Sequence, residues 1–238
     1  MRHTKTRPQI TCEECRSRSS SMFSVLCAHE LATISENKSC TIYKKGQILF
    51  HEGTRPLGIF CINSGKVKVY KIGTDGKEQI IRIAGKGDLL GYKAMLGEEY
   101  YAVSAETLED CTICFLSKHN FLETLNESSE LNQRIVKQIR HEHGMLVDEV
   151  TNQAQKSVRE RFAMALLKLK DTYGLDGHED GPVEINLTRE DLANFVGTAT
   201  ETLIRLLHEF KEDGMLETQG RKIRIIDSKQ LVKVARMM

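Results

Sequence analysis

The first half of the chain carries many short apolar runs separated by glycine. Between residues 40 and 116, runs rich in β-branched and aromatic residues include 59–62, 67–70 and 79–83. Asp75-Gly76 separates two of these runs, and this dipeptide favours the positive-φ turn of a β-hairpin. Many short strands at regular spacing predict an antiparallel barrel or roll.

A helical pattern replaces the strand pattern in residues 131–153, which contain no proline and a single glycine, Gly144. Apolar residues recur there at roughly every third or fourth position, as expected for one face of a helix. They are Leu131, Ile135, Ile139, Leu146 and Val150. A long helix with one narrow apolar stripe often pairs with its symmetry mate, so we expect a dimerisation helix. Packing of this stripe on the roll is the alternative.

The segment REDLANFVGTATETLIRLLH, residues 189–208, has the pattern of a helix-turn-helix. Ala193 is small where two crossing helices come close, and Gly197 suits a turn that needs positive φ. Leu203 and Leu206 would anchor the second helix. Residues 215–217 and 223–226 read as two short strands, which predict a wing with Arg221 at its tip.

The second helix of this motif carries two charged residues on one face, Glu201 and Arg205, four positions apart. In the major groove of DNA, glutamate accepts a hydrogen bond from cytosine and arginine binds guanine through two hydrogen bonds. We therefore expect these residues to read bases. An ion pair between them on a solvated helix is the alternative.

Charge and composition agree with a globular DNA-binding protein. The 34 Lys and Arg residues nearly balance the 33 Asp and Glu residues, but residues 216–238 are locally basic, which suits phosphate contacts. A solvated basic surface is the alternative.

No run approaches the roughly 18 apolar residues that span a bilayer, and no apolar segment follows the basic N-terminus. We expect a cytoplasmic protein without a membrane partner.

The sequence lacks the motifs of several common enzyme classes. We find no glycine-rich phosphate loop, nucleophile elbow or HExxH motif, so the chain is not expected to be an enzyme.

Seven cysteines, an odd number, argue against a disulfide framework in a protein expected to be cytoplasmic. Cys12 and Cys15 form a C-x2-C pair.

From about Phe23 onward the chain resembles the Crp/Fnr family of bacterial regulators. The resemblance rests on KKGQILFHEG, IFCINSGKVKVYK and GKGDLLG, then the long helix, then LTREDLANFVGTATETLIRLLHEFKEDGML. It implies an α+β fold with an N-terminal antiparallel β-roll of the cyclic-nucleotide-binding type, a long dimerisation helix and a C-terminal winged helix-turn-helix. We expect a mobile cysteine-containing arm in residues 1–21, the roll in 22–130, the dimerisation helix in 131–153 and the DNA-binding domain in 154–238.

The resemblance also implies partners and contacts. A homodimer would bind double-stranded promoter DNA, and RNA polymerase if it is an activator. The implied DNA-binding residues are Thr188, Arg189, Thr200, Glu201, Thr202 and Arg205, with Arg221 of the wing added.

The stretch that would bind the effector differs in sequence from that of the cAMP-binding members of the family. Those members hold the cyclic phosphate with an Arg-Ser pair, whereas the matching stretch here is Glu98-Glu99-Tyr100-Tyr101. Two carboxylates repel a phosphate. We therefore expect a regulator whose effector is unknown and is not cAMP.

The oxygen-sensing branch of the family suggests an alternative, in which an iron–sulfur cluster controls DNA binding. Cys12, Cys15 and Cys114 match three of its four ligands, while Ser20 lies near the place of the other and Cys27 lies seven residues further on. The same four cysteines could hold zinc, act as redox thiols, or be bystanders. His141 and His143 on the long helix are weaker candidates for haem or metal.

Overall fold

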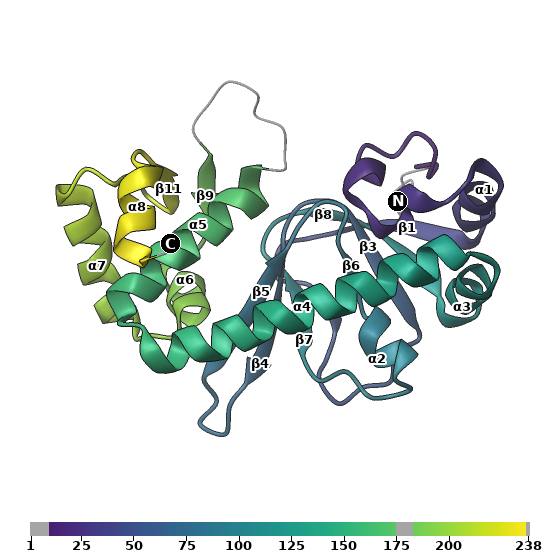
Figure 1. Ribbon diagram of the computed structural model, residues 1–238, viewed down its shortest axis with the longest axis horizontal. Helices are drawn as coiled ribbons and strands as arrows, with labels where there is room; N and C mark the ends of the chain where they lie inside the picture. Colours follow the sequence, from purple (N-terminus) through teal and green to yellow (C-terminus); the bar gives the residue numbers. More distant parts are fainter. Residues whose placement is uncertain (1–9, 175–182, 237–238) are drawn as a thin grey trace, which may run out of the picture. The chain divides into compact units, whose positions relative to one another are not determined.

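The computed structural model describes residues 10–174 and 183–236 (Figure 1). The chain divides into two compact units. Unit 1 comprises Met1–Val69 and Ala84–His143, and unit 2 comprises Tyr70–Ile83 and Gly144–Met238. None of the helices in the described ranges has the length and apolar character needed to cross a membrane.

Two four-stranded sheets form the predicted antiparallel roll. One has the order β1-β8-β3-β6 and the other the order β2-β7-β4-β5. The strands are β1 Lys38–Tyr43, β2 Ile48–Phe50, β3 Gly58–Ser64, β4 Val67–Ile72, β5 Glu78–Ala84, β6 Leu89–Leu90, β7 Ser104–Thr107 and β8 Cys111–Ser117. Ile62, Val67 and Ile113 are buried in one apolar cluster, which explains the alternation of apolar runs in the sequence.

Short helices cover one end of the roll. They are η1 Arg18–Ser20, η2 Met22–Val25, α1 Ala28–Asn37, α2 Tyr92–Leu96 and α3 Lys118–Glu127, with α1 beside α3 (Figure 1). The backbone N–H of Cys27 donates to the Glu30 carboxylate, 2.7 Å away, and this bond fixes the start of α1. Leu31 and Phe121 share a second apolar core cluster.

The described part of the N-terminal arm lies against this end of unit 1. The backbone N–H of Cys12 donates to the Ser35 hydroxyl at 3.0 Å, and the Ser20 hydroxyl donates to the Lys86 carbonyl at 3.4 Å. Ser17 and Ser21 are buried. The composition of the arm gave no sign of this packing, and its mobility stays a prediction.

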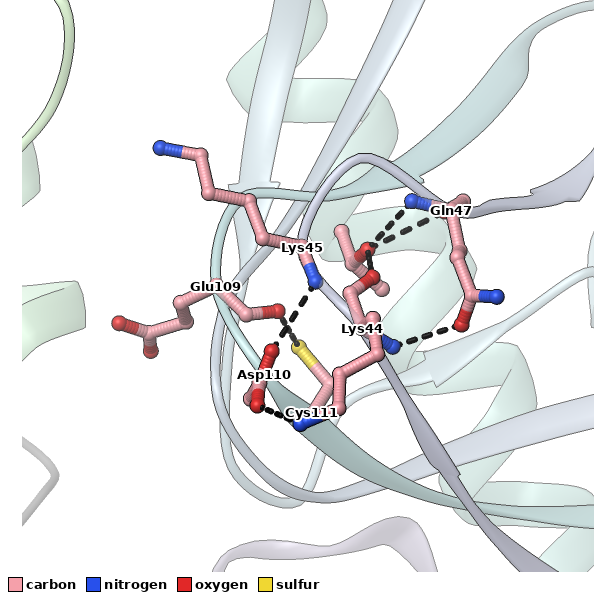
Figure 2. A network of polar contacts seen from close by, with 7 residues as sticks. Lys44, Lys45, Gln47, Glu109, Asp110 and Cys111 are labelled. Carbon is pink, nitrogen blue, oxygen red and sulfur yellow. Dashed lines mark hydrogen bonds and ion pairs between the residues drawn. The ribbon is translucent and has the colours of Figure 1, made fainter.

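A polar network fastens the turn after β1 to the turn before β8 (Figure 2). Both Lys44, through its ammonium, and Lys45, through its backbone N–H, donate to the Asp110 carboxylate. The Cys111 thiol donates to the carbonyl of Glu109 at 3.3 Å and is buried. The network fixes the register in which β1 and β8 pair.

Unit 2 contains the predicted winged helix-turn-helix. Its elements after the long helix α4 (Ser129–Gln155) are α5 Val158–Gly174, β9 Glu184–Asn186, α6 Arg189–Val196, α7 Thr200–Glu212, β10 Leu216–Gln219, β11 Lys222–Ile225 and α8 Ser228–Ala235. The antiparallel sheet has the order β10-β11-β9, and α5 packs against α6, α7 and α8 (Figure 1). The rings of Phe162 and Phe210, 4.8 Å apart between centroids, lie in this core.

Candidate nucleic-acid interface

The turn between α6 and α7 is fixed from both sides. The Thr188 hydroxyl accepts the Asp191 N–H at 2.9 Å and so caps α6, and Gly197 ends α6 with φ 74° and ψ 51°. Arg161 of α5 donates to the carbonyls of Val196 and Gly197 at 3.3 and 3.0 Å. Arg161 is a positioning residue that the sequence analysis missed, because nothing local to it marks a contact with a turn 35 residues away.

Helix α7 has one buried and one exposed face. Leu203, Leu206, Leu207 and Phe210 are buried, while Glu201, Ile204, Arg205 and His208 are exposed. Arg159 of α5 holds the far end of the helix through ion pairs with Glu209 and Asp213, both at 2.8 Å. The exposed face is therefore presented to solvent by a helix that is anchored on its other side.

The two predicted base-reading residues do not pair with each other. The Arg205 side chain is 74% exposed, and its Nε lies 3.9 Å from Glu209 rather than next to Glu201. Glu201 forms no hydrogen bond or ion pair with any residue that the structure describes. The alternative of an intrahelical Glu201–Arg205 pair is thus not what the structure contains, and both groups are available for a ligand.

The remaining predicted contact residues lie at the edges of this face. Thr200 and Thr202 are half-buried in the first turn of α7, and Arg221 is exposed in the wing. Arg189 of α6 donates from Nη2 to the Gly220 carbonyl at 2.8 Å, and its buried Nη1 has no partner among the described residues. Thr188 differs from the others, because its hydroxyl donates to the Asp191 carboxylate while it caps α6.

Part of the basic C-terminal surface is neutralised within the unit. Glu184 of β9 pairs with Lys222 and Arg224 of β11, each at 2.8 Å, and these hydrogen bonds lower the pKa of Glu184. Arg236 pairs with Glu160 at 3.2 Å. Because Lys222 and Arg224 are paired with Glu184, Arg221 supplies a larger share of the net positive charge of the wing than the sequence alone indicates.

Comparison with known proteins agrees with this geometry. A family profile described as "Cyclic nucleotide-binding domain" matches residues 41–128, and one described as "Crp-like helix-turn-helix domain" matches residues 160–234. The chain belongs to the Crp/Fnr family of transcriptional regulators. This membership confirms the predicted family, fold class and type of function, and the family is one of regulators rather than enzymes.

Relatives within the Crp/Fnr family match along nearly the whole chain. The regulatory protein HlyX of Actinobacillus pleuropneumoniae is 29% identical over 228 residues, which cover 94% of each chain. The transcriptional activator protein anr of Pseudomonas aeruginosa is 26% identical over 233 residues, covering 96% of this chain and 93% of its own. The solved structure of FixK2 from Bradyrhizobium japonicum shares the fold, with a TM-score of 0.71, 20% identity and coverage of 83% and 96%.

The apolar stripe of α4 in this Crp/Fnr protein differs from the predicted one. Leu131 and Ile135 are buried in the core of unit 1, so they are not free for contact with a second copy. Ile139, Leu146 and Val150 are exposed, and their part in a dimer stays a prediction. The exposed seam of α4 is Val136, Ile139, His143, Leu146 and Val150, spaced alternately by three and four residues. The first turns of α4 therefore pack in the core of unit 1, whereas the side chains of this seam are exposed.

The four candidate metal ligands do not form a metal site. Cys114 forms a disulfide with Cys40, and Cys27 is exposed at the start of α1. Cys12, Cys15 and Cys114 border one cavity of about 30 Å³, but Cys114 is engaged in its disulfide and Cys27 is outside the lining. Across residues 10–174 and 183–236, no three His, Cys, Asp or Glu side chains are placed to hold a metal. The residues as arranged therefore do not fit an iron–sulfur cluster or zinc.

The Cys40–Cys114 bond also corrects the expectation that the seven thiols form no structural disulfide. Cys40 and Cys114 are direct partners in the β1–β8 register. The sequence could not reveal this pairing, because the two residues are 74 positions apart.

Proposed function

We propose that this chain is a homodimeric regulator that reads a two-fold-symmetric DNA site with α7. The observation that carries the proposal is the exposed Glu201–Arg205 face of a helix whose opposite face is buried. Two copies related by a two-fold axis would place their α7 helices in successive major grooves. Such a protein works where promoter DNA is, which for a bacterial regulator is the cytoplasm.

Each exposed group on α7 has a distinct proposed role. Arg205 donates two hydrogen bonds to the O6 and N7 of guanine, and Glu201 accepts one from the amino group of cytosine. Ile204, 52% exposed between them, makes an apolar contact with a base edge. These contacts specify sequence because each recognises a different edge pattern.

A second set of groups holds the DNA backbone. Arg221 at the wing tip and Arg189 beside it supply positive charge, and Thr200 and Thr202 supply hydroxyls at the start of α7. Backbone N–H groups in that first turn favour an anion, because Ala199 caps α7 without a side-chain bond. Thr188 acts on the DNA indirectly, since its hydroxyl is engaged in capping α6.

The seam of α4 is the proposed dimer contact. Alternate spacing of three and four residues is the repeat of a two-stranded coiled coil. The apolar members Val136, Ile139, Leu146 and Val150 would otherwise stay exposed to water. RNA polymerase is a further partner if the protein activates transcription.

The effector of the roll is proposed to be something other than cAMP. Glu98 and Glu99 are exposed after α2, where an arginine of the cAMP-binding members would grip the phosphate. Their charge disfavours any phosphate at that position.

A selection from random duplex DNA, followed by binding measurements on the enriched site, tests the proposal. Arg205→Ala should weaken binding to the selected site by about 1–3 kcal/mol and relax discrimination at one base pair in each half-site. Arg221→Ala should weaken binding to all sequences alike and reduce the salt slope by about one. Lys77→Ala, at an exposed position between β4 and β5, is the control. Equal effects of Arg205→Ala and Arg221→Ala on all sequences, or no enriched site, would contradict the proposal.

A further inference from the structure

Three segments of unit 1 bring four cysteines to one cavity. Cys12 and Cys15 come from the N-terminal arm, Cys61 from β3 and Cys114 from β8. Apolar side chains of α1, Leu31 and Ile34 among them, complete the wall. Cysteines from distant parts of the sequence therefore border one small, mostly apolar space.

One of the two disulfide-bonded cysteines of unit 1 borders this space. Cys114 is opposite Cys40 on β1 and opposite Cys61 on β3, so the three side chains lie on the same face of the sheet. Cys114 borders the cavity, whereas Cys40 does not. Of the two bonded residues, Cys114 is therefore the one next to a nucleophile in the cavity, which makes Cys40 the departing group.

Cys15 is the thiol that the structure equips as this nucleophile. Its Sγ lies 2.9 Å from the Ser17 hydroxyl and accepts a hydrogen bond from the Asn63 amide at 3.1 Å. Partial burial acts to raise the pKa of Cys15, but the hydrogen bonds of Ser17 and Asn63 and the charge of Lys38 outweigh it and lower the pKa. Cys15 is only half-buried, so solvent can remove its proton.

The other thiols near the cavity are less suited to attack. Burial, together with the neighbouring Cys15 and Cys12, raises the pKa of Cys61 to about 12. Cys12 is buried, so solvent reaches its thiol less readily than that of the half-buried Cys15. Cys27 is outside the cavity lining.

We propose that this cavity is a site of thiol–disulfide exchange between Cys15 and the Cys40–Cys114 disulfide. The Cys15 thiolate attacks the Sγ of Cys114, so a Cys15–Cys114 bond forms while the Cys114–Cys40 bond breaks. The electron pair of the broken bond leaves on the Cys40 sulfur, which takes up the proton that Cys15 released. One disulfide replaces another, and therefore no external oxidant or reductant is consumed.

The exchange changes which parts of unit 1 are covalently joined. Before it, the bond links β1 to β8, two strands that are already paired. After it, the bond links the arm to β8. This covalent link adds to the hydrogen bonds by which the arm already contacts Ser35 and Lys86. The site therefore gives the arm a docked state that is fixed covalently.

Disulfide mapping on the full chain tests this inference without reference to DNA. Protein that carries the Cys40–Cys114 bond is incubated at several pH values without added thiol or disulfide, quenched in acid, alkylated and analysed by peptide mass spectrometry. We expect a Cys15–Cys114 linkage that increases with pH at the expense of Cys40–Cys114. Cys27→Ser should leave both linkages unchanged, and Cys15→Ser should retain only Cys40–Cys114.

Three results would overturn the inference. One is a Cys40–Cys114 linkage that stays intact at every pH while Cys15 is fully alkylated. Another is the absence of any linkage to Cys114. The third is a set of linkages that includes Cys27 as often as Cys15, since that pattern means exchange through unfolded chains. If Cys15→Ser does not fold, wild-type protein whose Cys15 is alkylated beforehand takes its place.

Discussion

Arg189 of α6 donates a hydrogen bond from Nη2 to the backbone carbonyl of Gly220, 2.8 Å away at the tip of the wing. The bond joins the start of the helix-turn-helix to the β10–β11 turn, two features that the sequence places 31 residues apart. The wing is thereby held at a set position relative to α6, and the positive charge of Arg189 lies at the same edge as Arg221.

Replacing Arg189 separates its positioning role from its charge. Arg189→Ala should weaken binding to every DNA sequence and reduce the dependence of log K on log salt by about one, because one phosphate contact is lost. Arg189→Lys keeps the charge but cannot form the same fork of donors. If binding depends on charge alone, Arg189→Lys restores the salt slope; if it depends on the tie to Gly220, Arg189→Lys binds as weakly as Arg189→Ala. Titrations at several salt concentrations distinguish the two, and full binding by Arg189→Ala would contradict both roles.

Gly197 is the residue of the turn with the least tolerance for change. Its φ of 74° is costly for a side chain, and a Cβ there would lie 3.1 Å from Gln153. Gly197→Ala should lower the free energy of unfolding of unit 2 by about 1–2 kcal/mol and weaken DNA binding, because the angle between α6 and α7 is disturbed.

A glycine in α4 offers the matched control for Gly197. Nothing lies within 4 Å of a Cβ built on Gly144, and its backbone is helical. Gly144→Ala should raise stability by up to about 1 kcal/mol, since alanine favours helix. Denaturant titrations followed by circular dichroism would measure both changes. A destabilising Gly144→Ala together with a neutral Gly197→Ala would contradict the account of the turn.

The seam of α4 predicts how the oligomer responds to charge. Leu146→Glu would place two carboxylates in an apolar dimer contact, so the dimer dissociation constant should rise by about 30-fold or more, equivalent to about 2 kcal/mol. His141 lies on the opposite side of the helix, and His141→Glu should leave the constant unchanged. Analytical ultracentrifugation measures both. Equal effects of the two variants, or no effect of Leu146→Glu, would mean that another surface forms the dimer.

Iron content tests the alternative that a cluster controls DNA binding. The disulfide at Cys114 and the exposed position of Cys27 leave too few ligands, so protein purified without oxygen should contain neither stoichiometric iron nor acid-labile sulfide. Metal analysis and a visible absorption spectrum provide the measurement. Four iron atoms per chain would show that the arm rearranges and that Cys40 and Cys114 separate when a cluster binds.

Patterns that act over short distances were predictable from the sequence. Glycine-separated β-branched runs gave the roll, and the Ala193–Gly197 spacing gave the helix-turn-helix with α6 and α7 close to their observed bounds. The long helix was placed at residues 131–153 and is found at Ser129–Gln155. In each case the residues that define the element are neighbours in sequence, so their spacing carries the signal.

Features that depend on distant partners were not predictable in the same way. Leu131 and Ile135 have the same spacing as Leu146, yet they pack on the roll, and only the tertiary structure decides which turns of α4 stay exposed. Strand β9, three residues long, has no pattern of its own, and Glu184 gains its role from pairing with β11. The Cys40–Cys114 bond could not be predicted either, because it depends on the register in which β1 and β8 pair.

Cys15 should react with iodoacetamide at a lower pH than an ordinary thiol. Only the thiolate is alkylated, so the rate rises with pH and reaches half its maximum at the pKa. Because the hydrogen bonds of Ser17 and Asn63 and the charge of Lys38 outweigh partial burial, the pKa of Cys15 is lowered, and the midpoint should fall below that of a cysteine in an unfolded peptide.

Asn63→Ala provides the variant for this measurement. It removes the amide that donates to the Cys15 sulfur, so the midpoint should move upward while the plateau rate stays similar. The buried thiols are internal references: burial raises the pKa of Cys61 to about 12 and of Cys111 to about 11, and both should stay unmodified through the midpoint of Cys15. Rates for each cysteine are obtained by peptide mass spectrometry after timed quenching. A Cys15 midpoint at or above that of an unfolded peptide would show that its surroundings do not stabilise the thiolate, and Cys15 would then lose its assignment as the nucleophile.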